Sequence, residues 1–165
     1  MQYYSTAYLL TGSNMGDRWA RLEQAATLIG DCCGRIVQRS PVYETAAWGN
    51  TDQAAFLNQA LELQTRYSAD ALMQQLLQLE EGMGRIRAER YGPRTIDINI
   101  LLFDDLVQST QLLTIPHPEM HKRRFALQPL AAIAPAARHP ALQKSIAALL
   151  AECPDGLPVR EAAGS

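Results

Sequence analysis

Four arginine residues crowd into ten positions of this 165-residue chain: Arg85, Arg87, Arg90 and Arg94. Positive charges at this spacing repel one another unless anions lie nearby, and the planar guanidinium group presents a fork of donors that suits phosphate oxygens. The segment therefore indicates a polyphosphate site. The alternative is a solvated loop whose arginines pair with neighbouring glutamates, and this stretch alone does not decide between the two.

The segment directly after the arginines carries oxygen ligands on a predicted strand, residues 95–103. Its apolar residues alternate as Ile96, Ile98, Ile100 and Leu102, so Asp97 and Asn99 should share the opposite face, because side chains alternate along a strand. Mg²⁺ binds one or two protein oxygens together with phosphate oxygens, which fits this pair. The alternative is the polar face of a half-exposed sheet.

A third candidate is His117, which stands between Pro116 and Pro118. Proline restricts the backbone on both sides of it, which suits a side chain that must stay aimed at a ligand. The two other histidines, His121 and His139, are expected at the surface.

The elements that must position these residues follow from periodicity and turn signals. Tyr8 to Thr11 predicts a strand that ends at Gly12, and the next apolar stripe predicts a helix that ends at Gly30. Strands are predicted at 36–43 and 56–63, with a long loop at 44–55 between them. Ser68 should cap a second helix, and a helical region should begin at about Arg123. The order βαββαβ predicts an α+β, ferredoxin-like fold: an antiparallel sheet with helices on one face and a C-terminal helical extension.

Composition limits the class of protein. With 47% hydrophobic and 19% charged residues, the chain should form one globular domain, residues 1–165, with an irregular tail after about 155. A net charge of −2 argues against a nucleic-acid partner, and no apolar stretch is long enough to span a membrane. The start lacks a secretory signal and the three cysteines lack metal-binding spacing, so we expect a cytoplasmic protein without structural zinc.

Five motifs occur in order between about residues 7 and 150, and together they resemble 6-hydroxymethyl-7,8-dihydropterin pyrophosphokinase. They are Gly12-Ser13-Asn14-x-Gly16, Tyr43-Glu44-Thr45-x-x-Trp48-Gly49, Phe56-Leu57-Asn58, Arg90-Tyr91-Gly92-Pro93-Arg94-Thr95-Ile96-Asp97 and Leu113-Thr114-Ile115-Pro116-His117-Pro118. The resemblance implies transfer of pyrophosphate from ATP to a pterin alcohol in folate biosynthesis, with two Mg²⁺ ions accompanying ATP. We expect a monomer that acts on these small molecules only.

The resemblance also assigns site residues by position. It implies that Asp97 and Asn99 bind the metal, and that ATP is bound by Arg85, Arg94, Thr114, His117 and Arg123. Arg85, Arg94, Asp97 and His117 are the expected catalytic residues. The pterin is expected against Thr45, Trp48, Phe56, Asn58 and Phe125, with the two phenylalanine rings stacked on its faces.

One position departs from the family, whose pattern is Asp-x-Asp. Asn99 supplies a neutral carbonyl oxygen in place of the second carboxylate. The chain is then an engineered variant, a natural enzyme that compensates elsewhere, or a pterin- and nucleotide-binding protein with weak or no catalysis. Two further classes stay open: an RNA-binding domain that uses an open sheet face, and a nucleotide-binding regulatory domain.

Overall fold

The computed structural model describes residues 3–45, 55–84 and 95–162. Its main strands are β1 (Ser5–Ser13), β2 (Arg35–Arg39), β3 (Tyr43–Thr45), β4 (Phe56–Thr65), β5 (Asp97–Phe103) and β10 (Val159–Glu161). Short strands form two small hairpins, β6 (Gln108–Ser109) with β7 (Thr114–Ile115) and β8 (Arg138–His139) with β9 (Lys144–Ser145). The helices are α1 (Arg18–Cys32), α2 (Ala69–Gly82), α3 (Arg124–Ile133), α4 (Ile146–Glu152) and the 3₁₀ turn η1 (Met120–Lys122).

The main sheet has the strand order β10-β3-β4-β1-β5, and β2 pairs with the second half of β4. Every pairing in it is antiparallel. The sequence β1-α1-β2/β3-β4-α2-β5 confirms the ferredoxin-like arrangement predicted from the pattern of elements.

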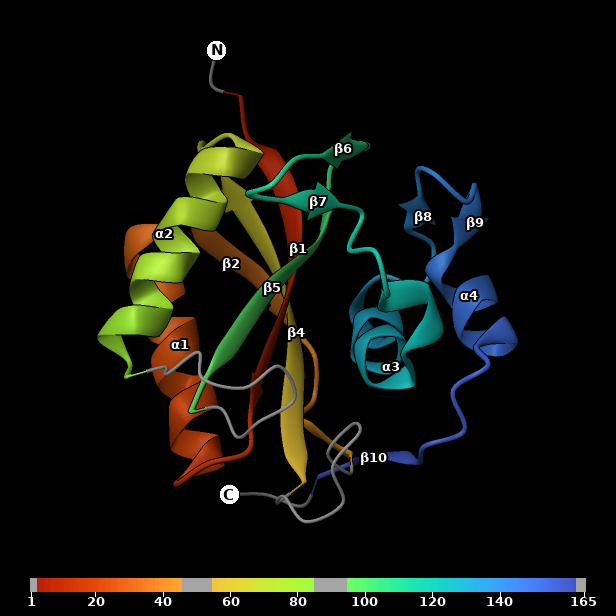
Figure 1. Ribbon diagram of the computed structural model, residues 1–165, viewed down its shortest axis with the longest axis horizontal. Helices are drawn as coiled ribbons and strands as arrows, with labels where there is room; N and C mark the ends of the chain where they lie inside the picture. The colour runs from red at the N-terminus through yellow and green to blue at the C-terminus, as the bar shows by residue number, and fades with distance from the viewer. Residues whose placement is uncertain (1–2, 46–54, 85–94, 163–165) are drawn as a thin grey trace.

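Helices cover both faces of the sheet (Figure 1). On one face α1 and α2 pack over a core that includes Leu9, Leu61 and Ile98. On the other face α3 and α4 pack over Leu10 and Leu101. The C-terminal helical extension therefore covers part of the face that a bare ferredoxin-like sheet leaves open.

Capping side chains start helices α1 and α2. Ser68 Oγ accepts the backbone N–H of Ala71 at 3.2 Å, as predicted for α2. Asp17 Oδ1 accepts the N–H of Ala20 at 3.0 Å and starts α1. The predicted end of α1 at Gly30 is wrong, because the helix continues to Cys32.

A β-bulge in β5 corrects one predicted side-chain direction. Tyr8 pairs with Leu102 while Leu9 pairs with Ile100, so Leu101 is an extra residue on β5. Ile98 and Ile100 face α1 and α2 as expected, but Leu102 lies in the α3 and α4 cluster. The bulge shifts the alternation only after Asn99, so Asp97 and Asn99 keep the predicted face.

The predicted strand at 36–43 is two strands, β2 and β3. Ser40 interrupts them: its N–H donates to Ala60 O and its hydroxyl accepts the N–H of Ala60, both at 2.9 Å. Pro41 follows and has no N–H to continue the ladder. The two short strands thus pair with different halves of β4.

Two expectations for the C-terminal part are also wrong. Residues 159–161 are not irregular, because they form β10 and pair with β3. His139 is buried and not at the surface. Its Nδ1 accepts the N–H of Leu142 at 3.0 Å and closes the β8–β9 turn, and its ring lies edge-on to that of His121. No helix in the described parts of the chain is long and apolar enough to cross a bilayer.

Candidate functional site

Three strands bring Asn58, Gly12 and Asp97 into one row across the sheet. Gly12 of β1 pairs with Asn58 of β4 on one side and with Asp97 of β5 on the other. Directly paired residues share a face, and neighbouring strands lie about 5 Å apart, so the ends of the row are roughly 10 Å apart. We name these three residues the polar row; it spans a distance suited to a small heterocycle joined to a phosphate group.

Asn58 forms one end of the polar row with a buried amide. Its Nδ2 donates to Thr11 O at 3.2 Å, whereas its Oδ1 is buried without a hydrogen-bond partner among the described residues. Thr45 Oγ1, on β3 beside β4, is in the same condition. Buried polar atoms are rarely left unpaired, so these two acceptors favour a ligand with N–H donors.

Gly12 has no side chain, which leaves room for the amide group of Asn58. A Cβ atom at position 12 would lie 2.5 Å from Asn58 Nδ2, which is closer than real contacts allow. Phe56 pairs with Thr45 and, two residues before Asn58 on β4, faces the same side. Phe56 is half-buried, which leaves part of its ring available for stacking.

Asp97 and Asn99 lie side by side at the other end, both half-buried. Asn99 Nδ2 donates to Asp97 Oδ2 at 3.1 Å. An amide rotation that exchanges its oxygen and nitrogen would present a carbonyl oxygen beside the carboxylate. No group of three or more histidine, cysteine and acidic residues gathers within the described segments, yet Mg²⁺ keeps several waters and needs only one or two protein oxygens. The pair therefore fits Mg²⁺.

His117 is held beside Asp97. Its backbone N–H donates to Leu101 O at 3.0 Å, which ties the segment to β5, and its Nδ1 accepts the N–H of Glu119 at 3.2 Å. Burial lowers the pKa of His117, and the positive charge of Arg123 lowers it further, against the opposing effect of Asp97. A neutral His117 with Nδ1 occupied carries its proton on Nε2, where it can donate to a phosphate oxygen.

Arg123 is the N-cap of α3, and Phe125 is the second residue of this helix. The guanidinium carbon of Arg123 lies 5.7 Å from the ring centroid of Phe125. Phe125 is half-buried against the α3 and α4 cluster. Thr114 is half-buried in β7, which lies beside β5. Arg85, Arg94 and Trp48 lie outside the described residues, so their predicted roles are not tested.

The sequence interpretation considered Glu80 of α2 only as a possible partner of the arginines and missed its contact with β5; its side chain is completely buried. Its Oε2 accepts the backbone N–H of Ile98 at 2.6 Å, between Asp97 and Asn99. Glu80 thus fixes the edge strand that carries the metal candidates. The signal was its position: it falls in the apolar stripe of Leu72 and Leu76, where a charged residue needs a buried partner.

Residues 8–135 match the family described as 7,8-dihydro-6-hydroxymethylpterin-pyrophosphokinase (HPPK). A 2-amino-4-hydroxy-6-hydroxymethyldihydropteridine pyrophosphokinase of Bacillus subtilis is 44% identical over 128 residues, 77% of each chain. A folic acid synthesis protein of Schizosaccharomyces pombe is 39% identical over 135 residues, 81% of this chain.

Several of the matched proteins are much longer than this chain. It spans 18% of the Schizosaccharomyces pombe protein. A solved HPPK-DHPS structure in complex with substrates superposes with a TM-score of 0.74 at 16% identity, over 91% of this chain and 43% of that one. At this identity the structural likeness supports the fold alone. On the family match and the identity to the Bacillus subtilis protein, the chain belongs to the 7,8-dihydro-6-hydroxymethylpterin-pyrophosphokinase family.

Proposed function

We propose that this chain transfers pyrophosphate from ATP to the hydroxymethyl group of 6-hydroxymethyl-7,8-dihydropterin, giving the pterin diphosphate and AMP in folate biosynthesis. The observation that carries the proposal is the polar row. At the Asn58 end, buried acceptors have no hydrogen-bond partner among residues 3–45, 55–84 and 95–162, and at the Asp97 end a carboxylate lies beside His117.

The Asn58 end suits the edge of a pterin. That edge carries an amino group and a ring N–H, both donors, and Asn58 Oδ1 and Thr45 Oγ1 are acceptors. A planar conjugated ring gains from stacking, which is the role we assign to Phe56 and Phe125. We also assign Trp48 to the proposed pterin site; it lies outside the described residues.

The Asp97 end suits the triphosphate. His117 can donate through Nε2–H, and Arg123 supplies a positive charge beside it. We assign Thr114, Arg85 and Arg94 to the same group. Asp97 and Asn99 would hold the two Mg²⁺ ions that accompany ATP, and bound Mg²⁺ would neutralise part of the phosphate charge.

The proposed reaction is an in-line displacement. The hydroxymethyl oxygen forms a bond to the β-phosphorus, the bond from that phosphorus to the oxygen bridging it to the α-phosphorus breaks, and AMP leaves with the bridging oxygen. The hydroxyl proton passes to solvent. The residues of the site align the two reactants and balance charge, and alignment of this kind can lower the barrier substantially.

The alternatives from the sequence are less well supported. The Bacillus subtilis relative is named a pyrophosphokinase, so a binding protein without catalysis is not favoured. An RNA-binding domain would use an open sheet face, yet Leu10 and Leu101 on that face are buried under α3 and α4. A monomeric, cytoplasmic enzyme remains a prediction.

Product analysis tests the proposal. The chain is incubated with ATP, Mg²⁺ and 6-hydroxymethyl-7,8-dihydropterin, and nucleotides and pterins are separated by chromatography. We expect AMP and pterin diphosphate in equal amounts, with no AMP when the pterin is omitted. Asp97→Ala should abolish both products. Formation of ADP, or AMP release that does not depend on the pterin, would overturn the proposal.

A further inference from the structure

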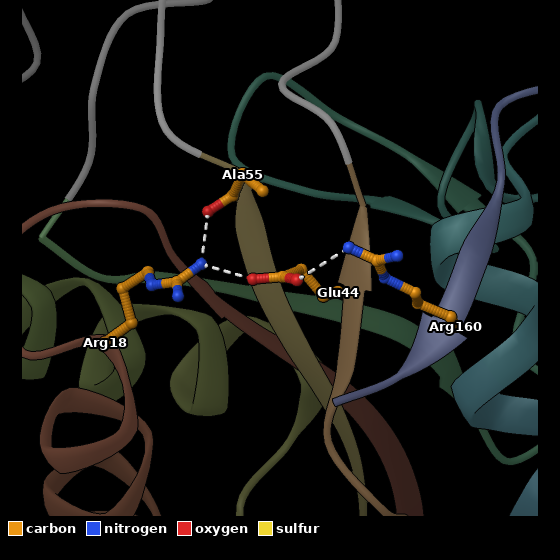
Figure 2. Close-up of polar contacts among 4 residues, drawn as sticks. All are labelled: Arg18, Glu44, Ala55 and Arg160. Atoms are coloured by element: carbon orange, nitrogen blue, oxygen red, sulfur yellow. Dashed lines mark hydrogen bonds and ion pairs between the residues drawn. The ribbon is translucent and has the colours of Figure 1, made fainter. Parts of the chain in front are cut away.

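The guanidinium group of Arg18 joins β3 to the residue that precedes β4 (Figure 2). Arg18 Nη1, at the start of α1, donates to Glu44 Oε2 on β3 and to Ala55 O directly before β4, both at 2.9 Å. Arg160 of β10 pairs with the other oxygen of Glu44 at 3.5 Å. We call the contacts among Arg18, Glu44 and Ala55 the strand clamp.

The strand clamp lies behind the proposed pterin site. Glu44 precedes Thr45 on β3, so their side chains point to opposite faces of the sheet. Thr45 pairs with Phe56, on the face of Asn58, whereas Glu44 meets α1 on the other face. Within the described residues, Arg18 and Glu44 therefore reach the proposed pterin site through the backbone that carries Thr45 and Phe56.

The pairing that the clamp reinforces is short. Among the described residues, β3 and β4 share three residue pairs, and Thr45 with Phe56 is the last of them. Pairs at the end of a short ladder open most easily. A charge-assisted hydrogen bond is stronger than a neutral one, and the hydrogen bond from Arg18 holds the pKa of Glu44 below its ordinary value.

Arg160 adds less than Arg18. Its side chain is 81% exposed and its contact with Glu44 is 3.5 Å long, so water screens the pair. Arg18 and Glu44 are only 28% and 25% exposed. Arg18 therefore stabilises the ends of the two strands more than Arg160 does, because it joins α1 to both Glu44 and Ala55.

We propose that Arg18 is a positioning residue for the pterin site, which holds Thr45 and Phe56 in register through its contacts with Glu44 and Ala55. The inference rests on the proposed function, because it takes these two side chains as part of the pterin site. It assigns Arg18 to pterin affinity rather than to ATP binding or to the transfer itself.

Arg18→Met tests the inference, because it keeps the aliphatic stem and removes both donated hydrogen bonds. We expect the KM for the pterin to rise about tenfold, while the KM for ATP and kcat change less than about twofold. Arg18→Lys should restore part of the pterin affinity, since an ammonium group can donate to both acceptors. Arg39→Met is the matched control. Arg39 of β2 also pairs with a glutamate of α1, Glu23 at 2.7 Å, but it lies away from Thr45 and Phe56. The Arg39→Met variant should therefore leave the pterin KM unchanged.

The outcomes separate the two proposals. If the unaltered chain forms no AMP from ATP and the pterin, the proposed function fails whatever the variants do. If it forms AMP but Arg18→Met leaves the pterin KM unchanged, or raises both KM values equally, the clamp inference is wrong. An equal rise in Arg39→Met would also overturn it. Thermal unfolding of each variant identifies a loss of folded protein, and Arg18→Lys then provides the test.

Discussion

Replacing Gly12 by alanine should disable the pterin end of the polar row without touching the phosphate end. The new Cβ atom would lie 2.5 Å from Asn58 Nδ2, so the amide must move. Moving it breaks the buried hydrogen bond to Thr11 O and turns Oδ1 away from the ligand. The expected effect is a steric clash and not backbone strain, because the added atom meets the side chain of Asn58 on the neighbouring strand.

The magnitude follows from the groups affected. A buried amide left without its partner costs about 1–3 kcal/mol, and the lower entropy of unfolded alanine returns about 0.4–1 kcal/mol, so we expect a net loss of about 1–2 kcal/mol of stability. Loss of the Asn58 contact should weaken pterin binding by about tenfold to a hundredfold.

The assay is calorimetric titration of the pterin in the presence of a nonhydrolysable ATP analogue and Mg²⁺. Gly30→Ala is the matched control, because its Cβ atom would meet nothing closer than Ile36 Cδ1 at 3.9 Å. Gly30 lies inside α1, so the control should gain about 0.5–1 kcal/mol of stability and keep its pterin affinity. Unchanged pterin affinity in Gly12→Ala would refute the assignment of Asn58 to the ligand.

Three further changes probe the phosphate end and the scaffold. Asn99→Asp should lower the Mg²⁺ concentration needed for half-maximal activity by about tenfold. In EDTA it should lower the melting temperature, because the two carboxylates then repel each other. Equal Mg²⁺ dependence of the two proteins would mean that the missing charge does not limit this chain. Glu80→Ala should lower the free energy of unfolding, measured by chemical denaturation, by about 2–4 kcal/mol, since it leaves the backbone N–H of Ile98 unpaired. Glu80→Gln keeps an acceptor and should lower it less. Equal losses in the two variants would contradict this role of Glu80. Burial lowers the pKa of His117 and of His139, so the unfolded chain binds more protons near pH 6 and the unfolding free energy should fall as the pH drops below about 7. Replacing both by glutamine should flatten the melting temperature between about pH 7.5 and 5.5, and an unaltered slope would refute that origin.

The strands and helices of the central unit were predictable because local signals repeat in them. Alternation identified β4 and the first part of β5, and the cap at Ser68 identified α2. The bulge at Leu101 was not predictable, since it depends on how β5 pairs with Tyr8 and Leu9 far away in the chain. β10 is also invisible locally, because three residues form a strand only when β3 offers a free edge.

The candidate site was predictable in its residues but not in its geometry. Motifs identified Asn58 and Asp97 separately, and only the register through Gly12 places them in one row. The contacts of Arg18 and Glu80 were missed because each joins segments far apart in the sequence. Arg18 lies in no apolar or catalytic pattern, and the position of Glu80 in the apolar stripe of α2 indicates a buried partner without identifying it.

A crystal structure of the chain with the pterin, a nonhydrolysable ATP analogue and Mg²⁺ tests the central claim most directly. We predict that the amino edge of the pterin lies about 3 Å from Asn58 Oδ1 and Thr45 Oγ1, and that the metal ions join Asp97 to the phosphates. A pterin bound elsewhere, with both acceptors still unpaired, would contradict the account.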